Sequence, residues 1–210
     1  MGAARDAVLY HGHRPHGRVA QDWPPYLIPY ASRCKIFPAG PVYGNMTMKN
    51  YTDNRKRILD IIRALDRPGT DAVIAYLERS NYFKRGCYSH HKEFGGLAAH
   101  SLEVYDYLTA HAGRTPSAAV AALFHDLGKT RRSDGRGHGA RSLDILDECG
   151  FALSEAERIA IGRHHDTSID FLTCPLRRAL SLGDCDSTGR WKRANPDQCG
   201  HRRSSRRTNK

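Results

Sequence analysis

The amino-acid sequence predicts an all-α fold on three observations. In the middle of the 210-residue chain, apolar residues recur three and four positions apart, which is the spacing of one face of an α-helix. Capping residues or prolines stand where several of these segments begin, and no segment alternates apolar and polar residues as a strand does. We therefore expect a single bundle of helices, flanked by extended and poorly structured terminal tails.

Each expected helix follows from its own start and stop signals. The first begins near Thr52, places Ile58 and Ile62 on one apolar face, and ends before Pro68. Thr70 can then cap the second helix. The full set of expected helices covers residues 52–65, 70–79, 97–111, 116–126, 138–149, 154–164 and 175–186.

The net charge of +11 is confined to the two ends of the chain. Residues 1–50 carry six basic and two acidic residues, and residues 190–210 carry eight and one, whereas the middle is formally neutral. We expect an irregular arm rich in proline and glycine over 1–50, the helical domain over 51–189, and a basic, disordered tail over 190–210. The tail is a candidate for contact with nucleic acid.

The cysteine pattern and the apolar runs indicate a cytoplasmic protein with no membrane partner. Six cysteines occur without a Cys-x-x-Cys pair, which favours reduced thiols over a disulfide framework. No apolar run approaches the roughly 20 residues that a membrane span needs. The N-terminus also lacks the basic and then apolar pattern of a secretion signal.

The most informative feature of the chain is the dipeptide His125-Asp126, which ends the apolar segment 118–124. Imidazole and carboxylate groups bind divalent transition metals, and an adjacent pair can contact two metals at once. His100 falls on the apolar face of its expected helix, so it needs a buried partner, either a metal or a carboxylate. Further candidate ligands lie at wide intervals along the chain, at His138, His164, His165 and Asp184.

This pattern resembles the HD superfamily of metal-dependent phosphohydrolases. His100, His125, Asp126 and Asp184 match the H…HD…D pattern of that superfamily in order, and His-Asp-Leu-Gly-Lys is similar to its extended HD-I-G-K motif. The resemblance covers roughly residues 52–189. It implies an all-helical domain in which these four residues bind one divalent metal.

The resemblance also implies a second metal, with the aspartate of the HD dipeptide as the bridge. Its other ligands fall at His138 and at His164 or His165. Neighbouring helix positions point about 100° apart, so we favour His164 and keep His165 as a further ligand or a supporting neighbour. Asp184 is preferred to Asp186 because Leu-Gly-Asp resembles the family's signature; Asp186 then orients a histidine or lies at a solvated helix end.

Four residues are candidates for the substrate side of the site. Lys129 follows the HD aspartate by three positions, close enough to contact a phosphate oxygen, and the family motif includes it. Arg131 could widen this positive rim, with a solvated loop position as the alternative. The segment 89–101, in which His90 and His91 precede Gly-Gly-Leu, is similar to HD domains of bacterial 3′-to-5′ exoribonucleases. Both histidines are therefore candidate pocket residues, with a structural role as the alternative.

Together these features predict a phosphohydrolase that cleaves phosphate mono- or diesters with a metal-activated water, Asp126 and Lys129 being the catalytic residues. The expected cofactor is one or two divalent ions among Mn, Fe, Zn, Ni, Co and Mg. The expected partner is a phosphorylated small molecule, such as a nucleotide, or a nucleic-acid end. Two alternatives stay open, namely a di-iron oxygenase of the HD type and a catalytically silent nucleotide-binding regulator.

Overall fold

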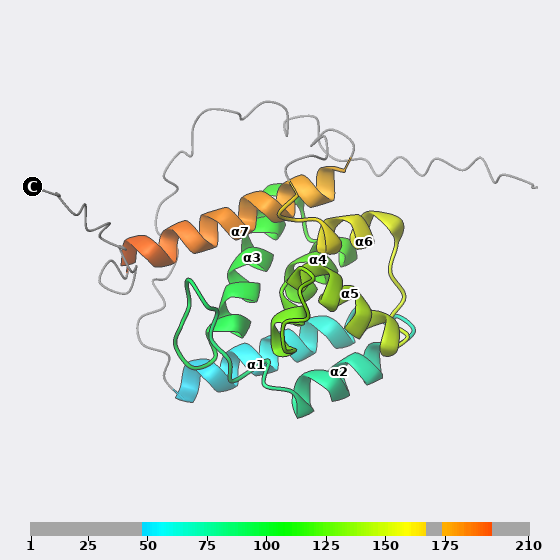
Figure 1. Ribbon diagram of the computed structural model, residues 1–210, viewed down its shortest axis with the longest axis horizontal. Helices are drawn as coiled ribbons and strands as arrows, with labels where there is room; N and C mark the ends of the chain where they lie inside the picture. Colours follow the sequence, from blue (N-terminus) through cyan, green and yellow to red (C-terminus); the bar gives the residue numbers. More distant parts are fainter. Residues whose placement is uncertain (1–47, 167–173, 195–210) are drawn as a thin grey trace, which may run out of the picture. The chain divides into compact units, whose positions relative to one another are not determined.

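The computed structural model of the protein describes residues 48–166 and 174–194. Within these residues all regular secondary structure is helical, so the all-α class predicted from the sequence is confirmed. No helix in this part of the chain is long and apolar enough to cross a membrane. The helices, shown in Figure 1, are α1 (Met48–Arg63), α2 (Thr70–Arg79), α3 (Gly96–Ala112), α4 (Pro116–Phe124), the short 3-10 helix η2 (Leu127–Thr130), α5 (His138–Glu148), α6 (Glu155–Gly162) and α7 (Pro175–Ala194).

Helix α4 forms the centre of the bundle, with α1, α3, α6 and α7 packed against it (Figure 1). Its start is fixed by Thr115, whose side chain accepts a hydrogen bond from the Ala118 backbone N–H, and by Pro116 in the first turn. Residues 118–124 are all buried. Truncation of Phe124 to alanine would cost about 3–5 kcal/mol, as for other buried aromatic residues. The residues that leave the C-terminal end of α4 therefore start from a tightly held position.

Two glycines allow the close packing that brings α3 to its neighbours. A Cβ atom on Gly183 of α7 would lie 2.9 Å from Leu108 Cδ1 of α3, so the small residue lets these helices approach each other. A Cβ atom on Gly96 would lie 2.0 Å from the carbonyl oxygen of His91, which no side chain tolerates. The close approach at Gly183 helps to set the position of the neighbouring Asp184. The close approach at Gly96 allows the loop of His91 to lie against the start of α3.

Several helix boundaries differ from the predicted ones by two to four residues; α1 ends at Arg63 and α4 at Phe124, each two residues earlier than predicted. α1 begins at Met48, so residues 48–50, which the sequence assigned to the arm, are helical. α6 ends at Gly162, and the backbone turns through His164 and His165 instead of continuing the helix to residue 164. The rest of the predicted arm lies outside the described residues.

Helix α7 is longer than predicted at its C-terminal end. It continues to Ala194, past the predicted helix end at residue 186 and the predicted domain end at residue 189. Trp191 accounts for the extension, because its side chain is 5 % exposed and its Nε1–H donates to Glu93 Oε2 at 3.2 Å. Residues 190–194 are therefore part of the helix and not of the tail; residues 195–210 lie outside the described part.

Candidate metal centre

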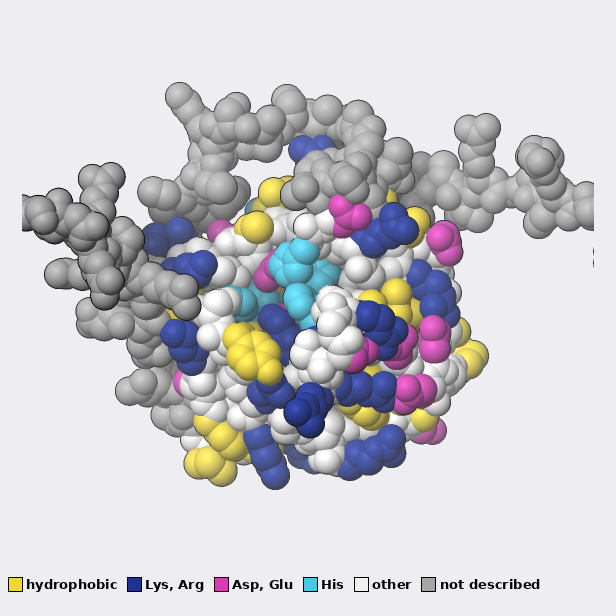
Figure 2. Space-filling model, in the orientation of Figure 1, with side chains coloured by type: hydrophobic (Ala, Val, Ile, Leu, Met, Phe, Trp, Pro, Cys, Tyr) yellow, Lys and Arg dark blue, Asp and Glu magenta, His cyan; other side chains and the backbone are white. Residues whose placement is uncertain are grey.

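Histidine side chains gather in the middle of one face of the molecule, with lysine and arginine side chains around them (Figure 2). The structure brings candidate ligands to this region from helices far apart in sequence. They are His100 in α3, His125 at the C-cap of α4, Asp126 directly after it, His138 at the start of α5, His164 and His165 after α6, and Asp184 in α7.

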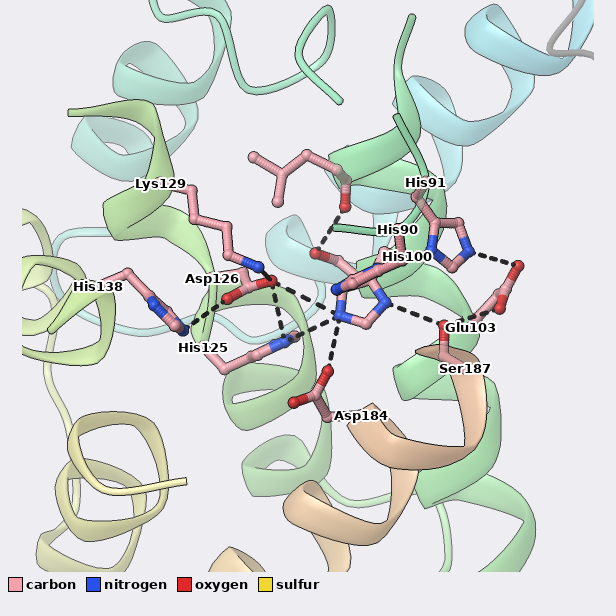
Figure 3. Close-up of polar contacts among 12 residues, drawn as sticks. His90, His91, His100, Glu103, His125, Asp126, Lys129, His138, Asp184 and Ser187 are labelled. Atoms are coloured by element: carbon pink, nitrogen blue, oxygen red, sulfur yellow. Dashed lines mark hydrogen bonds and ion pairs between the residues drawn. The ribbon is translucent and has the colours of Figure 1, made fainter. Parts of the chain in front are cut away.

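His100, His125, Asp126 and Asp184 form what we call the closed cluster, since all four side chains are buried (Figure 3). His100 Nε2 lies 3.3 Å from His125 Nε2 and 3.1 Å from Asp184 Oδ1. Asp126 Oδ2 lies 3.6 Å from the first of these nitrogens and 3.5 Å from the second. Donor atoms of His100, His125 and Asp126 thus lie within 4.8 Å of one another, and Asp184 contacts His100.

Two of the buried histidines have their ring protons fixed by backbone carbonyls. His125 Nδ1–H donates to the Ala122 oxygen at 2.9 Å, and His164 Nδ1–H donates to the Ile161 oxygen at 2.8 Å. A neutral imidazole carries one proton, so Nε2 of each ring presents a lone pair. Burial lowers the pKa of His125 to about 4 and that of His164 to about 3, which keeps both rings neutral near pH 7. Neutral rings with free lone pairs are suited to a divalent cation.

His138, His164 and His165 form a second group, which we call the open cluster. His138 Nε2 lies 3.0 Å from His164 Nε2, and one nitrogen of His165 lies within 4.8 Å of both. His164 is buried, whereas the side chains of His138 and His165 are 22 % and 61 % exposed. The preference for His164 alone assumed a continuous helix. Because α6 ends at Gly162, the following turn brings both histidines to His138.

Asp126 lies between the two clusters and contacts both. Its Oδ2 atom faces the closed cluster, while Oδ1 lies 3.0 Å from His138 Nε2 of the open cluster (Figure 3). That contact is not aligned as a hydrogen bond, and the buried Oδ1 accepts none from any described residue. A buried carboxylate oxygen without a hydrogen bond is expected to have another partner. The two oxygens of Asp126 face two different sets of imidazole nitrogens, an arrangement that fits a pair of divalent cations.

The charge of Asp126 is maintained by its surroundings. Burial alone would raise the pKa of this carboxyl group, but His125, His138 and Lys129 together hold it well below its usual range. Lys129 Nζ lies 2.5 Å from Asp126 Oδ2, within the same pocket of polar atoms (Figure 3). Asp126 is therefore ionised at neutral pH, as a metal ligand must be.

Ser142 of α5 joins the backbones of the two clusters and was not predicted from the sequence. Its Oγ accepts a hydrogen bond from the Gly128 N–H at 2.7 Å and lies 3.0 Å from the carbonyl oxygens of both His125 and His138. A serine in a helix has no metal-binding signal of its own. Its spacing of four residues from His138 places it on the same helix face, and that spacing was the available signal.

Two predicted site residues, Asp186 and Arg131, form ion pairs away from both clusters. Asp186 forms an ion pair with Arg190 one turn later in α7, at 3.0 Å. The guanidinium group of Arg131 forms an ion pair with Glu148 of α5. Each charge thus has a partner outside both clusters, and neither residue is in any of the metal-ligating groups among the described residues.

His90 and His91 lie beside the closed cluster and are both buried. Their Nδ1 atoms are 2.9 Å apart, and the ring centroid of His90 is 4.6 Å from that of His100. Burial lowers the pKa of His90 to about 3. His91 Nε2 lies 3.3 Å from Glu103 Oε1, so this ring contacts a buried carboxylate and does not reach the surface of the molecule.

Comparison with known proteins identifies the domain that carries this site. Residues 97–195 match the family model of the HD domain, a region that contains both clusters. This part of the chain is therefore identified as an HD domain, as the resemblance in the sequence predicted. No curated protein and no solved structure matches the chain. The similarity to bacterial exoribonucleases therefore stays a prediction.

Proposed function

We propose that the protein is a phosphohydrolase that uses one or two divalent metal ions to cleave phosphate mono- or diesters of nucleotides or oligonucleotide ends. The observation that carries the proposal is the position of Asp126, with one oxygen toward each cluster. The closed cluster would hold the first ion, and the open cluster with Asp126 would hold the second. Bound there, such ions lower the pKa of a coordinated water and offset the negative charge of a phosphate.

Lys129 is suited to contact the phosphate group of the substrate. Its side chain is 13 % exposed, at the edge of the buried cluster. Burial opposes its positive charge, but the attraction of Asp126 outweighs this effect and raises the pKa of Lys129 above its ordinary value. The ammonium group therefore stays charged and can donate to a phosphate oxygen while it holds Asp126 in place.

We expect the substrate to reach the site from the side of the open cluster. His165 is the most exposed of the candidate ligands, and Figure 2 shows histidine side chains that reach the surface among lysine and arginine side chains. A rim of positive charge attracts anionic esters and favours their approach. Contact of a nucleic acid with the basic C-terminal tail stays a prediction, as does the cytoplasmic location.

Metal analysis of anaerobically purified protein, combined with turnover of p-nitrophenyl phosphate and of its bis ester, tests the proposal. We expect one or two divalent ions per chain and hydrolysis of at least one ester that stops when a chelator removes the ions. Bound iron with oxygen consumption and no ester cleavage would instead indicate the oxygenase. Nucleotide binding without turnover of any ester would indicate the regulator.

A further inference from the structure

A chain of buried hydrogen bonds leads from His100 away from the closed cluster (Figure 3). His100 Nδ1 lies 2.9 Å from Ser187 Oγ of α7. Ser187 Oγ donates to Glu103 Oε2 of α3 at 2.8 Å, and the other oxygen of Glu103 lies 3.3 Å from His91 Nε2. All four side chains are buried, so no solvent competes for these contacts.

The direction of these hydrogen bonds determines which nitrogen of His100 is protonated. Ser187 has a single hydroxyl proton, which it gives to the Glu103 carboxylate. Its oxygen can therefore only accept from His100, and the proton of the neutral imidazole must be on Nδ1. His100 Nε2 then carries a lone pair, and it is this nitrogen that lies 3.1 Å from Asp184 Oδ1 in the closed cluster.

The place of His100 in its helix explains why it needs this arrangement. His125 and His164 lie at helix ends and donate to backbone carbonyls three residues earlier. His100 lies inside α3, where the preceding carbonyl oxygens accept the hydrogen bonds of the helix itself. Its Nδ1 proton therefore requires a side-chain acceptor, and a neighbouring helix supplies Ser187.

We propose that Ser187 and Glu103 are positioning residues for His100. They hold its ring in the Nδ1–H tautomer, aim Nε2 at the closed cluster, and thereby strengthen the binding of a divalent cation there. The inference rests on the proposed function only in taking the closed cluster as a cation site. A carboxylate that polarises an imidazole ligand through a hydrogen bond also increases the basicity of the ligand.

Glu103 contacts His91, which Trp191 packs against in turn; the sequence predicted other roles for both of these residues. His91, a candidate substrate residue, instead contacts this carboxylate, and the Trp191 ring lies against His91 with centroids 5.8 Å apart. Trp191 belongs to the part of α7 that was predicted as tail. The last two turns of α7 thus contribute to the site through both Ser187 and Trp191.

The test is the Co²⁺ affinity of the full-length Ser187→Ala variant, measured by visible absorption during titration of the metal-free protein. We expect the dissociation constant to rise roughly 10-fold to 100-fold, the range typical of supporting residues around metal ligands. Ser187→Thr keeps the hydroxyl and should restore most of the affinity. Ser101→Ala is the matched control, because Ser101 is equally buried in α3 but donates to the Leu97 carbonyl.

A second measurement separates positioning from general packing. ¹⁵N NMR of the metal-free protein, with the His100 signals assigned from a His100→Gln variant, should show the Nδ1–H tautomer. In Ser187→Ala this preference should be lost. Glu103→Gln should weaken it too, because an amide N–H of the glutamine can donate to Ser187 and free its hydroxyl proton for His100.

Two results would overturn the inference: a Ser187→Ala variant with Co²⁺ affinity within twofold of the unaltered protein, or an unchanged His100 tautomer in both Ser187→Ala and Glu103→Gln. If the unaltered protein binds Co²⁺ but cleaves no ester, the phosphohydrolase proposal fails while affinity and tautomer still decide this one. If it binds no Co²⁺, both proposals fail.

Discussion

The closed and open clusters offer the same kinds of donor atom but differ in their contact with solvent. His100 and His125 of the closed cluster are fully buried and enter from helices, whereas His165 of the open cluster is largely exposed and lies in a turn. Burial fixes ligands and excludes water, while exposure leaves a position for water or substrate. If the proposed ions bind, we expect the closed cluster to retain its ion and the open cluster to exchange its ion and to admit substrate.

Loss of a ligand from the closed cluster should have the largest effect. His125→Ala removes a buried Nε2 donor beside the bridging Asp126, and we expect metal retention and ester hydrolysis to disappear together, with activity down by three orders of magnitude or more. Metal content and turnover measured on the same preparation check this. His111→Ala is the control, because His111 contacts the Tyr107 carbonyl at 2.7 Å outside both clusters. Normal metal content with retained turnover in His125→Ala would remove the assignment.

Loss of a ligand from the open cluster should have a smaller and separable effect. His138→Ala removes the nitrogen that faces Asp126 Oδ1, but it leaves the four residues of the closed cluster intact. We expect one bound ion to remain and turnover to fall roughly 10-fold to 100-fold. Titration of the metal-free variant with Mn²⁺ gives the stoichiometry. If both ions are lost together, the two clusters act as one site, and the distinction between a retained and an exchangeable ion is wrong.

Acidification should destabilise the metal-free protein through its buried rings. The pKa values of His125 and His164, about 4 and about 3, lie below the ordinary value of 6.5. The unfolded chain therefore binds protons first, so stability is complete above pH 6.5 and falls toward pH 4, by about 1.4 kcal/mol per pH unit and ring.

Thermal unfolding of metal-free protein between pH 7.5 and 4.5 measures this slope. In a His125→Gln variant stability should fall less steeply with decreasing pH, because the buried imidazole with the lowered pKa has been removed. His165→Gln should change the slope less, because His165 is largely exposed. Equal slopes in all three proteins would contradict the difference in burial between the clusters.

The helices could be predicted because each depends on a local pattern, and the candidate ligands were proposed from one family motif. The apolar periodicity predicted α2 to within a residue, although its N-cap is Gly69 and not the predicted Thr70. The resemblance to the HD pattern selected His100, His125, Asp126 and Asp184, and the fold brings these four residues together. In each case the signal lies within one segment or one motif. The HD dipeptide is informative because its position at the end of a buried helix leaves little freedom.

The remainder depends on contacts between segments. Asp186 and Arg131 were placed near the site from their sequence neighbours, but the charges that pair with them, Arg190 and Glu148, decide where they point. Ser187 resembles any helical serine until α7 is packed against α3. The end of α6 at Gly162 was not predicted either, and it determines the geometry of the open cluster.

The smallest expected effect separates the two neighbouring histidines of the open cluster. His165→Ala removes an exposed ring, so we expect the free energy of unfolding to change by less than about 0.5 kcal/mol and the affinity for the second ion to fall only a few-fold. His164→Ala removes a buried ring, whose Nε2 faces His138 at 3.0 Å, and should weaken that affinity at least about 10-fold. Mn²⁺ titration of both variants, with the first ion already bound, gives the ratio. A larger loss in His165→Ala would mean that the exposed histidine is the principal ligand, and that burial does not rank the ligands within a cluster as it ranks the two clusters.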